Sequence, residues 1–292
     1  MDDAAAPITV GPFELHRRIG AGAMADVWQG VHRAEGLPVA VKVVTARDGP
    51  DPRFRRLFAQ EVRAVARLYH PGIVRLLDYG ELPANLPGGA DLPPEAPYCV
   101  MEWVPGGSLT GHGGRLAWPQ IRGVLLALLD ALGHAHARGV VHRDLKPDNV
   151  LLAERGPVLT DFGVAARLDE SDDEDEPQIL VGTPNYMAPE QIRGEWRDLG
   201  PWTDLYALGC LCWYLVTGQP PYGGRAQLGI LRGHLKESPP PFPERADLPW
   251  GFEDWARRLM AHNPENASCL RPMPPGRCGS WGTRTTTWRR RR

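Results

Sequence analysis

The sequence of 292 residues predicts an α+β fold of two lobes, the first built on antiparallel strands and the second mainly α-helical. The first 45 residues alternate apolar with polar positions and are punctuated by glycine, which is typical of strands joined by tight turns. From Ile121 onward, most segments have helical spacing and are joined by loops rich in glycine and proline. We therefore expect an N-terminal tail over 1–12, a strand-rich lobe with one helix over 13–104, a helical lobe over 105–265, and an irregular or disordered C-terminal tail over 266–292.

Composition excludes several classes of protein. Thirty-three basic residues against 35 acidic ones leave a net charge of −2, which argues against a dedicated nucleic-acid binder. The sequence has no run of about 18 uncharged apolar residues, so we expect no membrane span. The N-terminus MDDAAAPITV lacks the basic and apolar regions of a secretion signal. The five cysteines form no CxxC pair, which indicates reduced thiols in a cytoplasmic protein.

The strand-rich lobe carries two chemical features. Residues 19–28 predict a strand, a tight turn and a second strand, with Gly20 and Gly22 at the turn. Such glycines let backbone N–H groups approach a phosphate, although plain hairpins contain them too. Residues 39–44 form a β-branched run interrupted by Lys42. Because burying a lone ammonium group is costly, we expect Lys42 to have an anionic partner.

The remaining segments of this lobe are read from their periodicity. Residues 53–68 have apolar positions at helical spacing, which places Glu61 beside the apolar stripe of the predicted helix. Residues 81–97 contain five prolines and indicate a long surface loop. Residues 98–104 predict a further strand.

The second lobe begins with a long predicted helix over Ile121–Arg138. A second, strongly apolar helix is expected over Leu205–Val216, with Cys210 and Cys212 in its core. The run DESDDEDE over 169–176 is acidic, and its plain interpretation is a solvated loop.

Five motifs follow one another in order, and together they are far more specific than any one of them. They are Val39-Ala40-Val41-Lys42, helical Glu61, the run HRDLKPDN over 142–149, Asp161-Phe162-Gly163 and Ala188-Pro189-Glu190. From about Phe13 to about Pro264, the sequence resembles the protein kinase family, specifically the bacterial serine/threonine kinases of eukaryotic (Hanks) type. The resemblance implies the bilobal protein-kinase-like fold, with ATP bound between an antiparallel β N-lobe and an α-helical C-lobe.

The resemblance also implies a role for each matching residue. Lys42 would hold the α- and β-phosphates of ATP and would be oriented by an ion pair with Glu61. Asp144 would be the catalytic base for the substrate hydroxyl, and Lys146 would steady the γ-phosphate. We expect His142 to pack in the core or to bond backbone rather than to act in catalysis.

Asn149 and Asp161 would ligate Mg²⁺. Two hard oxygen ligands suit this ion, which keeps waters and takes its other ligands from phosphates. The five-residue step from Asp144 to Asn149 lets one short loop serve both the base and the metal. Phosphoryl transfer needs charge compensation and in-line positioning more than covalent chemistry, and these residue types supply both.

The ATP-binding residues implied by the resemblance come from the strand-rich lobe. They are Ile19, Gly20, Gly22, Val27, Ala40, Lys42, Met101, Glu102 and Val104. Residues 101–104 would form the hinge that reads adenine, with Met101 as the gatekeeper. Ala25 stands where the family has the third glycine of the loop, and we expect this change to have a modest effect.

The activation segment bears on the acceptor. Lys146, two residues after the base, and Thr183 match the serine/threonine form of the family, and the segment ending at Glu190 favours a polypeptide acceptor. Ser171 is the only hydroxyl residue within the acidic run. Two interpretations of that run stay open: its carboxylates replace the phosphate that Arg143 receives in relatives, or it is a solvated loop.

The end of the second lobe departs from the family's pattern. Asp204 resembles the family's buried aspartate that anchors the catalytic loop, but Ala267 stands near the place of an arginine that pairs with the glutamate matching Glu190.

We expect an Mg-ATP-dependent serine/threonine protein kinase that acts on protein substrates, and a homodimer would allow autophosphorylation. Two alternatives remain open: a pseudokinase that serves as a binding or scaffold module, and a kinase of small molecules.

Overall fold

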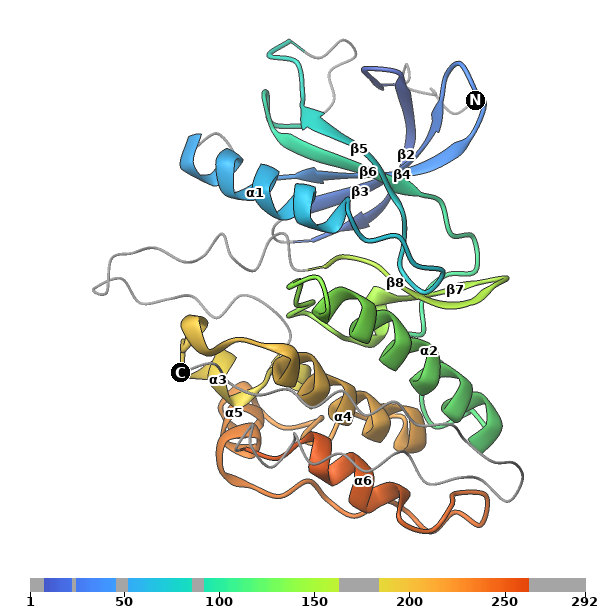
Figure 1. The fold of residues 1–292 in the computed structure, drawn as a ribbon, viewed down its shortest axis with the longest axis vertical. Helices are drawn as coiled ribbons and strands as arrows, with labels where there is room; N and C mark the ends of the chain where they lie inside the picture. The colour runs from blue at the N-terminus through green and yellow to red at the C-terminus, as the bar shows by residue number, and fades with distance from the viewer. Residues whose placement is uncertain (1–7, 23–24, 46–51, 86–91, 163–183, 263–292) are drawn as a thin grey trace. The chain divides into compact units, whose positions relative to one another are not determined.

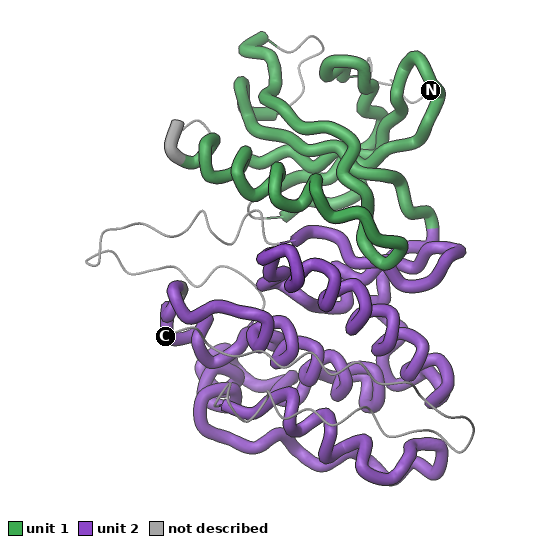
Figure 2. Tube along the Cα trace, viewed as in Figure 1, with its two compact units in different colours: residues 1–105, 163–172 green, residues 106–162, 173–292 purple. Residues whose placement is uncertain are grey.

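The computed structural model describes residues 8–22, 25–45, 52–85, 92–162 and 184–262 (Figure 1). The chain divides into two compact units, drawn in different colours in Figure 2. Among the described residues, unit 1 contains those up to Pro105 and unit 2 contains those from Gly106 onward. The first unit is a sheet with one helix, and the second is mainly helical, which confirms the predicted α+β class.

Unit 1 is built on a six-stranded antiparallel sheet with the strand order β1-β2-β3-β4-β6-β5. Its strands are β1 (Ile8–Val10), β2 (Phe13–Ala21), β3 (Ala25–His32), β4 (Pro38–Val44), β5 (Leu76–Glu81) and β6 (Pro97–Glu102). Strand β1 begins before Phe13, where the sequence predicts the lobe to start. It lies within the segment expected as an N-terminal tail and pairs with β2, with the side chain of Val10 buried.

The central strand β4 has two chemically different faces. Val39, Val41 and Val43 are fully buried and join the hydrophobic core of the unit. Ala40 and Lys42 alternate with them and are half-buried. Since successive residues of a strand point to opposite faces, β4 separates an apolar core face from a face that carries a charged side chain.

The segment between β5 and β6 contributes to the same core. Leu82, Leu92 and Ala96 are buried and belong to the cluster formed by the β4 valines. The expectation of a long surface loop over 81–97 is therefore wrong for these three residues. Prolines and glycines mark the turn chemistry correctly, but the isolated apolar residues between them have no periodicity that would reveal their burial.

Among the described residues of unit 1 there is one helix, α1 (Pro52–Val65), which packs against β5 and β6. Phe54, Phe58 and Val62 form its buried stripe, as helical spacing requires. Glu61 lies next to that stripe and is half-buried. The prediction that this carboxylate lies beside the apolar face is confirmed.

Unit 2 is organised around α4 (Pro201–Thr217), which contacts both α2 (Trp118–His136) and α6 (Phe252–Leu259). Cys210 and Cys212 on α4 are fully buried free thiols, as the sequence predicts. The other elements are η1 (Pro147–Asn149), β7 (Val150–Ala153), β8 (Gly156–Leu159), η2 (Pro184–Tyr186), α3 (Pro189–Ile192), η3 (Trp196–Asp198) and α5 (Gln227–Lys236).

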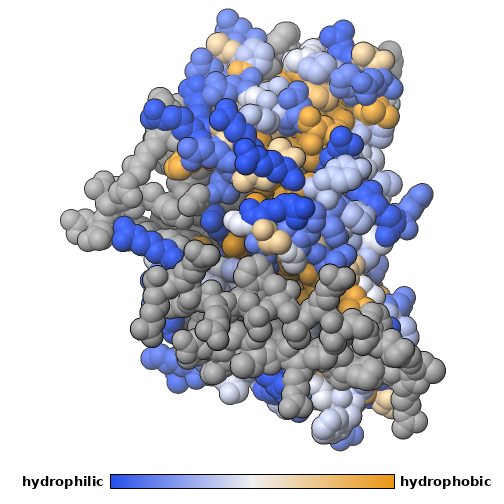
Figure 3. Space-filling view, viewed as in Figure 1, coloured by the Kyte–Doolittle hydropathy of each residue, from blue (hydrophilic) through white to orange (hydrophobic). Residues whose placement is uncertain are grey.

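The surface of the described residues is mixed. Hydrophilic side chains dominate the face drawn in Figure 3, and hydrophobic ones show between them. None of the described helices has both the length and the apolar character needed to cross a bilayer.

Candidate active site

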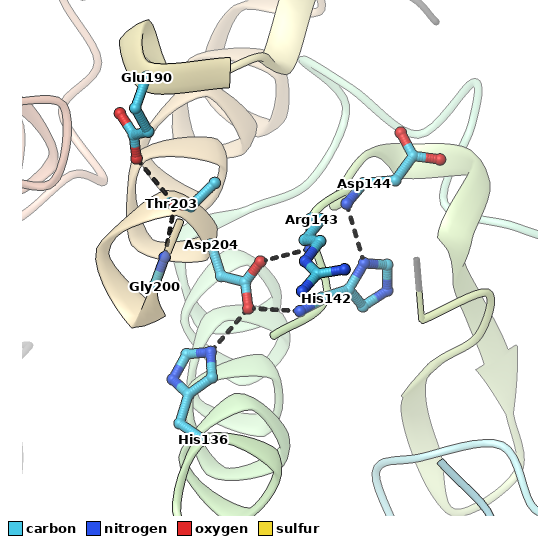
Figure 4. A network of polar contacts seen from close by, with 8 residues as sticks. All are labelled: His136, His142, Arg143, Asp144, Glu190, Gly200, Thr203 and Asp204. Carbon is cyan, nitrogen blue, oxygen red and sulfur yellow. Dashed lines mark hydrogen bonds and ion pairs between the residues drawn. The ribbon is translucent and has the colours of Figure 1, made fainter. Parts of the chain in front are cut away.

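The side chain of Asp204 organises the polar centre of unit 2 (Figure 4). It lies at the start of α4 and is fully buried. Its Oδ2 accepts hydrogen bonds from His136 Nε2 at 2.6 Å and from the backbone N–H of His142 at 2.8 Å. Its Oδ1 accepts the backbone N–H of Arg143 at 2.8 Å. The chain at 142–143 is thus attached to α4, which confirms the predicted role of this aspartate.

Burial alone would raise the pKa of Asp204, but the hydrogen bond and charge of His136 and the N–H of His142 hold that pKa below its usual range. A buried carboxylate that accepts three donors is stable as an anion. Asp204 is therefore a fixed negative charge under the loop rather than a group that exchanges protons.

The imidazole of His142 fixes the loop from its other side. It is fully buried; its Nδ1 accepts the backbone N–H of Asp144 at 3.3 Å, and its Nε2 donates to the carbonyl of Thr160 at 2.9 Å. The Phe162 ring lies 4.6 Å from it, centroid to centroid. The prediction that His142 packs in the core and bonds backbone is confirmed.

Two residues of this region have a left-handed backbone without being glycine. Arg143 has φ 67° and Asp161 has φ 58°. Such conformations are strained for residues with a side chain, and they persist where surrounding bonds impose them. Arg143 is held in this way at both of its backbone groups: its N–H donates to Asp204, and its carbonyl accepts Gln191 Nε2 at 2.8 Å.

The loop brings together two predicted catalytic side chains, Asp144 and Lys146, and one predicted metal ligand, Asn149. Lys146 Nζ lies 2.6 Å from Asp144 Oδ2, and Asn149 Nδ2 donates to the same oxygen at 2.9 Å and to the Asp144 carbonyl at 2.7 Å. The Asp144 side chain is 45 % exposed, whereas Asn149 is buried. One carboxylate oxygen is thus held by two neighbours while the group as a whole stays accessible to solvent.

Asp161 follows β8 and adjoins the same loop through its neighbour Thr160. The N–H of Thr160 donates to the carbonyl of Asn149 at 3.0 Å, and its carbonyl accepts His142 Nε2. Both backbone groups of Thr160 are therefore fixed by the loop that carries Asp144. The structure places Asp161 directly beside this attachment, half-buried.

The residues present fit a divalent cation. Because Asn149 uses its amide nitrogen toward Asp144, its Oδ1 takes no part in those two bonds and is of a type that can ligate a cation. An amide oxygen and the carboxylate of Asp161 form the kind of hard-oxygen set that Mg²⁺ prefers.

In unit 1, five of the nine candidate ATP-binding residues share one face of the sheet. Directly paired residues of neighbouring strands lie on the same face. Val27 pairs with Gly20 and with Lys42, and Ala40 pairs with Met101. These residues occupy the face of β4 opposite its buried valines. This face thus combines side chains from the three neighbouring strands β3, β4 and β6 with the glycine backbone of β2.

The other predicted residues of unit 1 have separate positions. Ile19 is exposed on β2, and Gly22 donates its N–H to the carbonyl of Ala25 at 3.0 Å, closing the turn. The N–H of Glu102 donates to the Arg75 carbonyl, and its Oε1 accepts the Arg75 N–H, both at 2.9 Å. Val104 is buried.

Glu190 has a different partner from the one the family pattern implies. It is buried on α3, and its Oε1 accepts a 2.7 Å hydrogen bond from Thr203 Oγ1 (Figure 4). Burial raises the pKa of Glu190, and the bonds from its own backbone and from Thr203 oppose that rise. The neighbourhood of Ala267, where relatives carry the arginine, lies outside the described residues.

Thr203→Val should reveal how much Glu190 depends on this hydroxyl. A buried carboxylate that loses one donor should cost about 2 kcal/mol of unfolding free energy at pH 8. Because the folded-state pKa of Glu190 is raised, the cost should shrink as the pH falls toward 4.5, where the carboxyl becomes protonated in both states. Urea unfolding at several pH values measures this.

Thr217→Val is the matched control on the same helix, since Thr217 Oγ1 donates to the neutral carbonyl of Trp213. Its effect should be smaller and independent of pH. Equal pH profiles for the two variants would contradict the role given to Thr203.

Sequence reasoning missed three supporting residues: His136 as a partner of Asp204, Thr203 as a partner of Glu190, and Gln191. The Gln191 amide donates to the Arg143 carbonyl, and its Oε1 accepts the N–H of Ala188 at 3.0 Å. Gln191 directly follows the Ala-Pro-Glu motif, which is the only signal that could have drawn attention to it.

Ser171, Thr183 and the acidic run over 169–176 lie outside the described residues, as does the predicted C-terminal tail.

Comparisons with known proteins agree with this geometry. The family model of the protein kinase domain matches residues 13–266. The chain is 38 % identical over 258 residues to the serine/threonine-protein kinase PknA of Mycobacterium tuberculosis, a match that covers 87 % of this chain and 57 % of the relative. It is 37 % identical over 266 residues to the serine/threonine-protein kinase Pkn1 of Myxococcus xanthus, with 89 % of this chain and 36 % of that protein covered.

A solved structure has the same fold. The crystal structure of a mutant of the Mycobacterium tuberculosis PknI kinase domain matches with a TM-score of 0.65 and 29 % identity, over 90 % of this chain and 92 % of that one. The chain spans between about a third and just over half of the length of the two relatives compared above.

Proposed function

Because the chain belongs to the protein kinase family, among the bacterial serine/threonine kinases of Hanks type, we propose that it transfers the γ-phosphate of Mg-ATP to serine or threonine hydroxyls of proteins. The observation that carries this proposal is the arrangement of Asp144, Lys146 and Asn149 around one carboxylate oxygen. A solvated loop without a catalytic role would not need Lys146 and Asn149 on the Asp144 carboxylate, nor its own backbone anchored to the buried Asp204.

In the proposed mechanism, Asp144 accepts the proton of the acceptor hydroxyl. Its Oδ2 is oriented by Lys146 and Asn149, so its other oxygen is presented to the substrate in a fixed direction. Lys146 carries a positive charge at the same point and would compensate charge on the transferred phosphoryl group. Asp204 and His142 act through the backbone by holding the loop still.

Asn149 and Asp161 would hold the cation through their side-chain oxygens. A bound Mg²⁺ supplies charge neutralisation at the phosphates. The protein's own contribution is the orientation of Asn149, whose amide nitrogen is committed to Asp144.

Unit 1 would supply the nucleotide contacts. Lys42 would bind the α- and β-phosphates and be oriented by Glu61, while Val27, Ala40 and Met101 would pack on the base.

We also propose autophosphorylation, with a homodimer as one arrangement for it, and a cytoplasmic setting. The cytoplasmic setting is supported by the described cysteines, all of which are free thiols.

The test is labelled-phosphate transfer to peptides that differ only in one acceptor residue: serine, threonine, tyrosine or alanine. We expect incorporation into the serine and threonine peptides, and none into the alanine peptide. Transfer to a sugar or an antibiotic but to no peptide would support a small-molecule kinase instead. A nucleotide-induced thermal shift without any transfer would identify a pseudokinase.

A further inference from the structure

His234 is a histidine outside the catalytic loop that lies close to the segment preceding the Ala-Pro-Glu motif. His234 on α5 is fully buried. Helix α5 contacts η2, and η2 also contacts α4. The η2 residues, 184–186, directly precede the Ala-Pro-Glu motif at 188–190. The inference below rests on the proposed function, since it concerns how the polypeptide acceptor is positioned.

The ring of His234 contacts two tyrosine rings and is held at one nitrogen. Tyr222 meets it edge-to-face at 4.8 Å, and Tyr206 of α4 lies 5.7 Å away, centroid to centroid. The Tyr206 hydroxyl is 2.9 Å from His234 Nδ1. Gly233 leaves no spare room, because a Cβ there would come within 2.5 Å of the Tyr222 ring. These contacts restrict the orientation of the imidazole.

The other side of the ring faces the backbone of η2. The backbone groups of Pro184 and Asn185 lie beside it and favour its protonated form, as carbonyl oxygens do, although Nε2 makes no hydrogen bond of full geometry. The Pro184 carbonyl also closes the η2 turn by accepting the N–H of Met187 at 3.3 Å. When Tyr206 donates to Nδ1, the Nε2–H is directed toward these carbonyls.

We propose that His234 is a positioning residue for the protein substrate: its neutral imidazole, held by Tyr206 of α4, lies against η2 and supports the backbone of 184–187, on which the acceptor segment would bind. It touches neither ATP nor the reacting atoms. Its effect therefore belongs to the binding of the polypeptide and not to the chemical step.

The electrostatic setting keeps this bridge neutral. Burial, together with the charge of His262, lowers the pKa of His234 to about 4, against the opposing influence of the η2 backbone. The titratable groups that face the cluster are Tyr206 and Cys210 on α4, Tyr222 before α5, Glu190 on α3 and His262 after α6. Three charged residues, Arg225, Glu237 and Arg257, lie on the outer side of Tyr222. Burial raises the pKa of Tyr206 and Tyr222, so both remain neutral.

A pH prediction follows. The folded-state pKa of His234 lies below its unfolded value of 6.5, so its contribution is complete above pH 6.5 and is lost as the pH falls toward 4. Over that window the folding equilibrium constant should fall on the order of 10²-fold more in the wild type than in His234→Gln. Parallel acid profiles would contradict a neutral buried ring.

The kinetic test compares three variants. His234→Leu removes both polar ends, His234→Asn keeps a polar group near the Nδ1 position, and His234→Gln keeps one near the Nε2 position. We expect the KM for a peptide acceptor to rise about tenfold in the Leu and Asn variants, with kcat and the KM for ATP within twofold. The Gln variant should restore most of the peptide KM, because it retains a donor toward η2.

Trp213→Phe is the stability control. It removes one buried hydrogen bond, from Trp213 Nε1 to the Pro240 carbonyl at 2.9 Å, on the side of α4 that packs on Phe242. It should lower the melting temperature without a change in the peptide KM. If it raises the peptide KM as much as His234→Leu does, the effect is general loosening and the proposal is wrong.

A second readout does not depend on activity. Hydrogen exchange at the Met187 amide should be about tenfold faster in His234→Leu than in the wild type and should return toward the wild-type rate in His234→Gln. Unchanged exchange would overturn the proposal even in an active enzyme. If the wild type transfers no phosphate to any peptide, the proposed function fails, while the exchange measurement still decides whether His234 sets η2.

Discussion

Asp144→Asn should reduce kcat for phosphate transfer by about 10³-fold, within the range that general acid–base catalysis contributes. The asparagine has the size of the aspartate and can still interact with its neighbours in the loop, so the fold should persist. What it loses is the ability to accept the hydroxyl proton. The KM for ATP should stay within about threefold, because Asp144 acts on the acceptor and not on the nucleotide.

Asp148→Asn is the matched control, since Asp148 is an exposed carboxylate in the same loop, on η1. It should leave kcat within twofold of the wild type. If both variants lose activity equally, the loop is sensitive to any loss of charge, and Asp144 has no special role as the base.

Asp204→Asn should lower the unfolding free energy by about 3–5 kcal/mol. Asp204 accepts three hydrogen bonds with its two oxygens, and an asparagine has only one acceptor oxygen. In either orientation, the new amide group opposes at least one buried N–H donor. Urea unfolding measures the loss, which is a large share of the margin of a typical domain.

Activity should fall with the same change, by at least about 10²-fold, because the backbone N–H groups of His142 and Arg143 lose their fixed acceptor and the loop that carries Asp144 shifts. His136→Phe removes one of the three bonds and should have an intermediate effect on stability. Asp254→Asn, at an exposed position of α6, should change the unfolding free energy by less than about 0.5 kcal/mol. A value for Asp204→Asn as small as that of Asp254→Asn would contradict the anchoring role.

Those parts of the site that are local in sequence could be predicted from it. Asp144, Lys146 and Asn149 lie within one short run, so their proximity needs no knowledge of the fold. Lys42 is similar, because its position in a β-branched strand fixes which face it occupies. The apolar helix α4 is predictable from its composition, although it begins at Pro201 rather than at Leu205, since proline is tolerated in the first turn.

The supporting contacts could not be predicted in the same way. His136 and Asp204 are 68 residues apart, and Gln191 reaches the Arg143 carbonyl across 48 residues. Ordinary polar residues of this kind give no periodic signal, and only the packing of α2, α3 and α4 brings them to the loop. The burial of Leu82 and Leu92 escapes prediction for the same reason, because tertiary packing overrides local composition.

Labelled-phosphate transfer with purified wild type and Asp144→Asn side by side tests the central claim most directly. Both proteins are first shown to be folded by their melting temperatures, and both are given Mg-ATP and one protein acceptor. The account predicts label in the acceptor with the wild type alone, recovered as phosphoserine or phosphothreonine. A folded wild type that is stabilised by Mg-ATP and transfers no label would contradict it.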